Sequence, residues 1–253
     1  MLSLKESLKR TIKQEGYAKK VTKMWPIGYV RANMTRYKLR RSVASFTKLD
    51  GIVDLAFSFR FLGISIKPKQ VEEEIRRLLK LLQNIKPKVV LEIGTAKGGT
   101  LFSFTRVAQP DATLISIDLP EAPFWGGYPA WKIPLYESFA LPCQKIHLIK
   151  RDSHDSVTLG VIKNILDNRK VDFLFIDGDH EYEGVKRDFE MYSVLVRNGG
   201  IIAFHDICPH HPETGCEVNK FWVELKEKYR YLELVKDWKQ RWAGIGVIYV
   251  SHG

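Results

Sequence analysis

The sequence predicts an α/β fold built on a doubly wound, mostly parallel sheet, preceded by a basic and mainly helical extension. Segments with helical and strand periodicity alternate from about residue 67 onward, and most of the strands are continuous apolar runs, as expected for parallel strands covered on both faces. The net positive charge is confined to the first 48 residues, which marks the extension. We therefore expect an extension at residues 1–66 and one α/β domain at residues 67–253.

The net charge of +11 belongs to one end of the chain. Residues 1–48 contain 13 Lys and Arg residues and two acidic ones, whereas residues 49–253 contain 27 of each sign. The extension could cover the sheet edge or form a dimer, contact an anionic membrane surface, or bind nucleic acid. A nucleic-acid-binding domain would spread its charge more evenly, so we favour the structural role, expect a homo-oligomer, and rank membrane contact above nucleic acid.

Composition indicates a soluble globular protein. The hydrophobic fraction is 45% and the charged fraction 27%, and no run of about 18 apolar residues is present for a membrane-spanning helix. Lys and Arg recur through the first dozen residues, unlike a signal peptide, and the three cysteines form no disulfide pattern. We expect a cytoplasmic protein.

Each element of the domain follows from its periodicity. In the extension, Leu4, Leu8 and Ile12 predict a short amphipathic helix, and residues 65–70 mark the junction with the domain. The predicted strands are 88–93, 112–117, 146–149, 171–176, 200–204, 231–235 and 245–250. Helices are predicted at about 71–82, from the turn after residue 93 to 108, and at 155–168, 182–197 and 217–229. Seven strands in this alternation predict a Rossmann-like sheet.

The turn after the first strand of the domain is rich in glycine. Residues 89–100 read VVLEIGTAKGGT, with glycines that permit a tight turn and a close approach of the backbone to a ligand. The spacing differs from that of dinucleotide folds and of the P-loop. We expect Glu92, Gly94, Thr95 and Gly98 to contact a cofactor, with Glu92 suited to an ammonium group directly or through water. The alternative is that the glycines serve packing alone.

Acidic residues also follow the second and third predicted strands. Asp118 ends the second strand, where doubly wound folds place an acid to bind ribose hydroxyls. Asp152 and Ser153 follow the third strand, at the edge where an adenine would lie. Alternatively, Asp118 simply caps the strand, and Asp152 or Ser153 is the N-cap of the next helix.

Two neighbouring strands end in polar residues that suit acid–base and metal chemistry. Residues 173–184 read FLFIDGDHEYEG, and residues 201–206 read IIAFHD. Asp177 and Asp206 should lie close enough to share a divalent cation, for which carboxylate oxygens favour Mg²⁺ or Ca²⁺, with Mn²⁺ as a further option. His180 suits a general base, and His205 is its competitor or an orienting group. The alternative is that Asp177 or Asp179 caps the helix without a metal.

The segments Leu91–Gly99, Phe175–Gly184 and Gly199–Asp206 resemble the class I S-adenosylmethionine (SAM) dependent methyltransferases. More narrowly, the chain is similar to the group containing macrolide-sugar and rhamnosyl O-methyltransferases and cephalosporin-hydroxylase-like proteins. The resemblance covers about residues 67–250.

This resemblance implies a ligand set. It places SAM at Glu92, Gly94, Asp118 and Asp177, a Mg²⁺ ion at Asp177 and Asp206, and a histidine base at His180. One departure concerns the residue after Asp206: several metal-dependent relatives carry a second carboxylate or an amide there, and this chain carries Ile207.

The resemblance implies O-methyl transfer to a hydroxyl group of a small molecule or glycan, with Asp177 and His180 as the catalytic residues. The alternatives are an RNA methyltransferase that uses the basic arm, and a non-catalytic protein that binds SAM or metal. Residues 208–216, CPHHPETGC, could form a substrate loop or a zinc site, and the aromatic residues 124–131 could wall the acceptor pocket or only pack on the surface.

Overall fold

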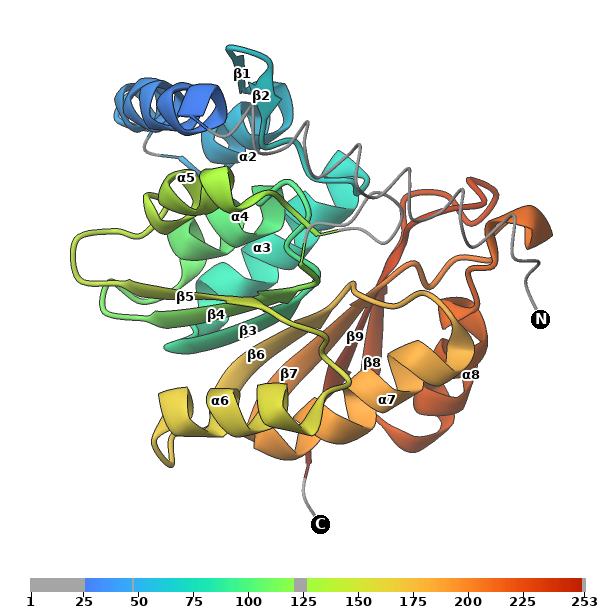
Figure 1. The fold of residues 1–253 in the computed structure, drawn as a ribbon. Helices are drawn as coiled ribbons and strands as arrows, with labels where there is room; N and C mark the ends of the chain where they lie inside the picture. Colours follow the sequence, from blue (N-terminus) through green and yellow to red (C-terminus); the bar gives the residue numbers. More distant parts are fainter. Residues whose placement is uncertain (1–25, 47, 121–126, 252–253) are drawn as a thin grey trace, which may run out of the picture.

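The computed structural model describes residues 26–46, 48–120 and 127–251 (Figure 1). The predicted amphipathic helix around Leu8 and the aromatic residues Phe124 and Trp125 lie outside the described residues. The described chain contains a seven-stranded sheet with the order β5-β4-β3-β6-β7-β9-β8, in which β9 runs antiparallel to both of its neighbours. This arrangement confirms the predicted doubly wound, mostly parallel α/β fold.

All seven predicted strands form, with boundaries that shift by a few residues. They are β3 (Val89–Ile93), β4 (Thr113–Asp118), β5 (Lys145–Lys150), β6 (Val171–Ile176), β7 (Val196–His205), β8 (Tyr231–Leu234) and β9 (Ile245–Tyr249). Strands β3, β6 and most of β7 are buried, because helices cover both faces of the sheet.

The helices form one layer on each face (Figure 1). One layer contains α2 (Leu49–Ser58), α3 (Glu72–Ile85), α4 (Gly99–Val107) and α5 (Ile133–Glu137), and the other contains α6 (Ser156–Leu166), α7 (Tyr182–Tyr192) and α8 (Val218–Lys228). Short 3₁₀ turns occur at η1 (Ala130–Lys132), η2 (Ser193–Leu195) and η3 (Pro212–Thr214).

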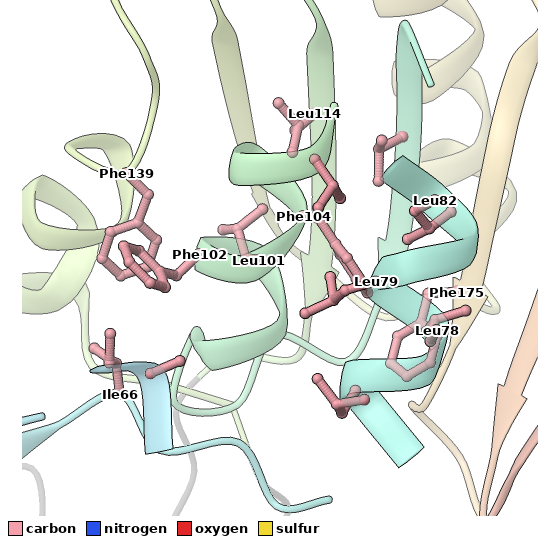
Figure 2. Close-up of a cluster of buried hydrophobic side chains, with 14 of the residues drawn as sticks. Ile66, Leu78, Leu79, Leu82, Leu101, Phe102, Phe104, Leu114, Phe139 and Phe175 are labelled. Carbon is pink, nitrogen blue, oxygen red and sulfur yellow. The ribbon is translucent and has the colours of Figure 1, made fainter. Parts of the chain in front are cut away.

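Each layer packs through its own hydrophobic core. On the α3 face, Leu78, Leu79 and Leu82 meet Phe104 and Phe175 (Figure 2). The opposite core joins α6, α7 and α8 to the other side of the same strands, through residues that include Ile162, Val185, Phe221 and Trp222. The sheet is therefore packed on both faces.

The helix predicted at 182–197 ends earlier than expected, at Tyr192. Residues 193–195 form a 3₁₀ turn, and β7 already begins at Val196. The reason is long-range pairing: the N–H of Gly199 donates to the carbonyl of Val250, and the N–H of Val250 donates to that of Gly200. Together with the pairing of Val196 with Val171 of β6, these bonds bring the residues before the predicted strand into the sheet.

The described part of the extension packs on the α3 face. A helix spans residues 26–43, and α2 contacts α3 and α4, so Ala32, Leu39 and Val53 belong to the same core as the sheet. Strands β1 (Arg60–Phe61) and β2 (Ile64–Ser65) form a small antiparallel hairpin with a two-residue loop. Within the described residues, no helix has both the length and the apolar character needed to cross a membrane.

The strand order sets the position of the functional residues. From β3 the chain proceeds outward through β4 and β5, and it then returns to the other side of β3 with β6 and β7. The register aligns Ile93 with Ile117 and Ile176, and Ile176 with Phe204. The four strands therefore end at one level, at the crevice where open α/β sheets bind ligands.

Candidate functional site

The turn after β3 requires glycine at position 94. Gly94 has a φ of +97°, and a Cβ atom there would lie 2.0 Å from the carbonyl oxygen of Asp177. The N–H of Gly94 donates to Ile117 at 2.8 Å, and the N–H of Asp177 donates to Ile93 at 2.9 Å. The glycine turn is therefore clamped between the ends of β4 and β6, and its backbone touches the acidic residue that follows β6.

Glu92 is a fully buried carboxyl group directly behind this turn. The hydroxyl of Ser116 donates to its Oε2 at 2.5 Å, and the hydroxyls of Ser116 and Thr95 lie 2.6 Å apart. Its other oxygen, Oε1, is buried and forms no hydrogen bond of normal geometry, although the Thr100 hydroxyl lies close enough to lower the pKa of Glu92. Burial raises the pKa of Glu92 to about 8, against the opposing effect of the Ser116 hydrogen bond. An unpaired buried acceptor of this kind fits a ligand that brings a donor, such as an ammonium group.

Asp118 reaches from the end of β4 to the glycine turn. Its Oδ2 accepts the N–H of Ala96 at 2.7 Å, and its Oδ1 accepts the N–H of Leu119 at 2.8 Å. Burial raises the pKa of this carboxyl group, and the backbone hydrogen bonds oppose that shift. The structure thus brings Glu92, Gly94, Thr95 and Asp118 together around one turn.

Asp152 and Ser153 lie two and three residues after β5, which pairs with β4 through Lys150 and Asp118. The side chain of Asp152 accepts the N–H of His154 at 2.8 Å, and the carbonyl of Ser153 accepts the Tyr192 hydroxyl at 2.6 Å. The alternative that one of them caps the helix is wrong, because the N-cap of α6 is Asp155. The cap forms there because the Asp155 side chain reaches the N–H of Val157 at 2.8 Å.

The second group of predicted residues forms a cluster at the ends of β6 and β7. His205 lies between the carboxylates: its Nδ1 is 3.1 Å from Asp177 Oδ1 and 3.2 Å from Asp206 Oδ2. His180 faces the same pair, with Nε2 3.6 Å from Asp177 Oδ1 and Nδ1 3.6 Å from Asp206 Oδ2. His210 Nε2 lies 3.1 Å from Asp206 Oδ1. We call these five residues the acid–base cluster.

Exposure separates the histidines of the acid–base cluster. His205 is 4% exposed, whereas the His180 side chain is 47% exposed. Burial opposes the charged form of His205, but the two carboxylates outweigh it and raise its pKa to about 10. Burial likewise opposes the charged forms of Asp177 and Asp206, yet His205 holds the pKa of both below the usual range. His205 therefore is the buried imidazole between the two carboxylates, and His180 is the imidazole that solvent or a ligand can reach.

Residues outside the predicted motifs complete the acid–base cluster. The side-chain amide of Gln70 donates to Asp177 Oδ2 at 2.7 Å, although the two residues are 107 positions apart. The N–H of Ala243 donates to Asp206 Oδ1 at 3.0 Å. Neither residue belongs to a pattern that a single sequence reveals. Asp177 is occupied by these contacts and does not cap α7, whereas Asp179 accepts the N–H of Glu181 at 2.9 Å, just before that helix.

Two sets of side chains bring possible metal-ligand atoms within 4.8 Å of one another: Asp177, His205 and Asp206 in one, and His180, Asp206 and Cys216 in the other. Asp177 and Asp206 thus lie close together, as the two neighbouring strand ends predicted. Across the described ranges, no such set contains two cysteines and two histidines, so the predicted zinc alternative finds no four-ligand site. Cys208 instead is buried, with its Sγ 3.7 Å from the side-chain amide of Gln240.

The family comparison covers both groups of residues, since residues 91–207 match a family described as a methyltransferase domain. By this match, the central part of the chain is similar to methyltransferase domains. The match includes the glycine turn, Asp118 and the acid–base residues up to Asp206.

Solved structures of methyltransferases share the fold of this domain. The O-methyltransferase TomG from Streptomyces achromogenes, involved in tomaymycin synthesis and solved with SAM, aligns with a TM-score of 0.54 at 16% identity, over 83% of this chain and 94% of TomG. An O-methyltransferase from Bacillus cereus, solved with S-adenosylhomocysteine (SAH), gives 0.50 at 14% identity over 87% and 100%. The uncharacterized protein R132 of Acanthamoeba polyphaga mimivirus is 32% identical over 90 residues, which are 35% of this chain and 40% of the viral protein.

Proposed function

We propose that this protein is an O-methyltransferase, which transfers the methyl group of SAM to a hydroxyl group of a small molecule or glycan. The observation that carries the proposal is the contact between the two halves of the site. The backbone of Asp177 lies directly against Gly94, so the acid–base cluster adjoins the turn where the cofactor is expected. Methyl transfer needs this adjacency, because it depends on positioning and on removal of the hydroxyl proton.

On this proposal, SAM supplies an electrophilic methyl group on a sulfonium centre, and the chain supplies its binding groups. The buried Oε1 of Glu92 takes the cofactor's ammonium group, directly or through a water molecule, and Asp118 takes the ribose hydroxyls. Gly94, Thr95 and Gly98 shape the turn, and Asp152 and Ser153 border the expected adenine site. The SAM-bound and SAH-bound relatives support this assignment through their shared fold.

We further propose that Asp177 and Asp206 hold a divalent cation, with Mg²⁺ first and Mn²⁺ second. Their carboxylate oxygens lie within 4.8 Å of each other, on either side of His205 Nδ1, and such hard oxygen donors suit these ions. A cation held there would bind substrate oxygens and make a hydroxyl group more acidic. Gln70 and His210 orient the two carboxylates through their far oxygens.

His180 is the proposed general base. It is the imidazole of the acid–base cluster that stands open to a substrate, and it faces both carboxylates at 3.6 Å. In this proposal the hydroxyl proton moves to a ring nitrogen of His180 as the methyl group transfers. His205 then serves to hold the two carboxylates in place.

The acceptor is proposed to be a small molecule or glycan with a free hydroxyl group. The involvement of TomG in tomaymycin synthesis supports a small-molecule acceptor for a domain of this fold. The half-buried Trp131, which belongs to the aromatic segment, packs against Gly28, so this part of the segment serves packing.

The proposal can be tested with one set of matched variants. SAH release should be measured with a panel of hydroxyl acceptors, for wild type, Asp177→Asn, Asp206→Asn and the control Asp179→Asn. Loss of either carboxylate should lower metal affinity or activity by at least about 10–100-fold. That is the usual cost of losing a group that only orients a metal ligand. SAH affinity should stay unchanged in Asp206→Asn, and the control should behave as wild type. Chelator-treated enzyme should recover with Mg²⁺ or Mn²⁺.

Two results would contradict the proposal at different levels. Full turnover in excess EDTA would remove the metal from the mechanism and leave His180 as an unaided base. SAH binding by wild type without turnover on any acceptor would favour a non-catalytic SAM-binding protein.

A further inference from the structure

A buried carboxylate outside the acid–base cluster anchors the loop between β8 and β9. Glu74 of α3 is fully buried. Its Oε1 accepts the N–H of Lys236 at 3.0 Å and the side-chain amide of Gln240 at 2.8 Å, and its Oε2 accepts the N–H of Gly244 at 2.9 Å. One side chain therefore ties down both ends and the middle of residues 236–244, which we call the Glu74 loop.

The Glu74 loop is also fastened to the end of β7. The N–H of Ala243 donates to Asp206 Oδ1, and the N–H of Cys208 donates to the carbonyl of Ala243 at 3.0 Å. The loop therefore stands at a fixed place beside the acid–base cluster. Hydrogen bonds that hold a loop at both ends prepare it to present side chains to a ligand.

The side chains that this loop presents are aromatic and basic. Trp238 and Trp242 are 50% and 44% exposed, and Lys239 and Arg241 are exposed as well. The one acidic side chain of the loop, Asp237, accepts the backbone N–H of Lys239 at 2.9 Å. Among the described residues, neither Lys239 nor Arg241 forms an ion pair with a carboxylate.

A cavity of about 610 Å³ lies between this loop and the loop after β7. It is lined by Pro209, His210, Pro212, Trp238, Lys239 and Arg241. His210 contacts the cavity and also lies 3.1 Å from Asp206, so the cavity opens beside the acid–base cluster. Its volume falls within the roughly 300–1,000 Å³ typical of small-molecule sites.

From this arrangement we infer that the cavity binds the acceptor, and that the acceptor is a ring compound with a phosphate or carboxylate group. Arg241 and Lys239 bind the anionic group, since guanidinium and ammonium groups are the usual partners of such anions. Trp238 lies against the ring, and His210 borders the end of the cavity nearest Asp206. The inference rests on the proposed function, because it identifies the cavity as the acceptor site of the same reaction.

Binding can be measured without turnover, by quenching of tryptophan fluorescence with three probes. Glucose 6-phosphate and glucuronate carry the two candidate anions, and glucose is the neutral reference. We expect both anionic probes to bind at least about 10-fold more tightly than glucose, as for hydrogen bonds to charged groups. The Lys239→Gln/Arg241→Gln double variant should lose that preference, and Lys228→Gln, an exposed lysine on α8, should keep it. A difference between the two anionic probes would identify the preferred anion.

Equal binding of the three probes, or an unchanged preference in the double variant, would overturn the anionic acceptor while leaving methyl transfer intact. Calorimetry with SAH tests the proposed function separately, because the double variant should bind SAH as wild type does. Failure of wild type to bind SAH would overturn methyl transfer without affecting the anion measurement. With an acceptor in hand, the double variant should raise KM for it and leave kcat nearly unchanged.

A separate observation concerns the helix at residues 26–43, which lies at the outer edge of the α3 layer (Figure 1). The side toward the domain carries mostly small residues: Gly28, Ala32 and Thr35 are buried, together with Leu39. A Cβ atom at Gly28 would lie 2.8 Å from the ring of Trp131, so the helix is seated closely.

The large apolar side chains of this helix point outward instead. Ile27, Val30, Met34 and Tyr37 recur at spacings of three and four and are 63%, 58%, 51% and 65% exposed. No acidic residue occurs between positions 16 and 49, while five Arg and Lys residues lie within the helix itself. An apolar stripe flanked by positive charge is typical of helices that lie on a lipid surface.

We propose that this stripe binds the surface of a membrane that contains anionic lipid. The charge argues against a second copy of this chain, because pairing two such helices would bring like charges together. Apolar side chains would enter the headgroup region, and the flanking Lys and Arg residues would contact lipid phosphates.

The test is co-sedimentation of the full chain with vesicles of phosphatidylcholine, alone or mixed with phosphatidylglycerol. We expect binding to the mixed vesicles only, weakening as salt is raised. Val30→Ser/Met34→Ser should weaken it at least about 10-fold, through lost apolar burial. Val223→Ser, at an exposed valine of α8, should change nothing. Absence of vesicle binding, or a dimer that the double variant dissociates, would overturn the proposal.

Discussion

Two pairs of carboxylates lie at the same edge of the sheet, and their surroundings act on them in opposite directions. Glu92 and Asp118, at β3 and β4, are held by a hydroxyl group and by backbone N–H groups, and burial raises the pKa of both. Asp177 and Asp206, after β6 and at the end of β7, contact imidazoles, and the pKa of both is lowered despite burial.

The difference shows that the position of each carboxylate and its pKa are set by different features of the structure. The parallel register places all four groups at one crevice, whereas the neighbours of each group set its charge. The β3–β4 pair is left with an unsatisfied buried acceptor, which suits a cofactor that brings positive charge. The β6–β7 pair already contacts a buried imidazole, that of His205, and a second imidazole, that of His180, is open to solvent. The predictions below separate these two pairs.

The largest effect should follow Gly94→Ala. This residue lies where the β3–β4 pair contacts the β6–β7 pair, so its substitution should disturb both. A Cβ atom there would lie 2.0 Å from the Asp177 carbonyl oxygen, at a φ that disfavours side chains, so the turn must move. We expect a loss of stability above about 1 kcal/mol, and SAH binding below detection in calorimetry. Gly160→Ala is the matched control, since its Cβ atom would meet nothing within 4 Å. Wild-type SAH affinity in Gly94→Ala would contradict the assigned cofactor turn.

The next largest effect should distinguish two histidines within the β6–β7 pair. His180→Ala should lower turnover by about 10²–10⁴-fold, the usual contribution of a positioned general base, with little change in stability or SAH affinity. His205→Ala should instead cost about 3–5 kcal/mol of folding stability, because it leaves the largely buried carboxylates of Asp177 and Asp206 without the buried imidazole between them. Turnover across pH and urea unfolding of both variants are the measurements. If His180→Ala kept wild-type turnover, the base would have to be another group.

A smaller effect is expected at Asp118. Asp118→Ala removes the proposed acceptor for the ribose hydroxyls and should weaken SAH binding about 10–100-fold, as for hydrogen bonds to a charged group. Asp111→Ala, near the start of the same strand and in an exposed ion pair with Lys88, should bind SAH normally. Isothermal titration calorimetry compares the two. An unchanged affinity in Asp118→Ala would move the ribose site away from β4.

The smallest expected change in SAH binding concerns Glu92→Gln. This variant should bind SAH more weakly but be more stable than wild type at alkaline pH. The pKa of Glu92 is about 8 in the folded chain against an ordinary value of 4.5, so the folded state favours the protonated form. Its contribution to stability is therefore fully present below about pH 4.5 and is lost as pH rises through 8. Glutamine avoids this loss, and the ligand-free variant should be more stable than wild type at pH 8.5, by on the order of a few kcal/mol.

The same variant should bind SAH about 10-fold more weakly, because a neutral amide is a poorer partner for an ammonium group. Urea unfolding at pH 5 and pH 8.5 and calorimetry with SAH measure the two effects. A stability difference that does not grow with pH would mean that Glu92 is charged in the folded chain. An unchanged SAH affinity would mean that its free oxygen does not face the cofactor.

Local sequence determined the strands, the helices and the residues at the strand ends. Apolar runs and glycine spacing report on short-range periodicity and backbone freedom, which is why β3, the turn at Gly94 and the polar ends of β6 and β7 could be predicted. The adjacency of Asp177 and Asp206 also followed from sequence, because parallel strands end at the same edge of a sheet. The boundary of α7 did not, since β7 gains its first residues by the pairing of Val196 with Val171 and of residues 199–200 with Val250.

Tertiary structure alone decided how each of those residues is surrounded. Gln70 reaches Asp177 across 107 positions, and Glu74 holds the Glu74 loop from more than 160 positions away. His205 rather than His180 occupies the buried place between the carboxylates: the ring at the end of β7 is 4% exposed, whereas the side chain that precedes α7 is 47% exposed. Such contacts depend on side chains that meet only after the layers have packed, and no local pattern in the chain encodes the distance between them.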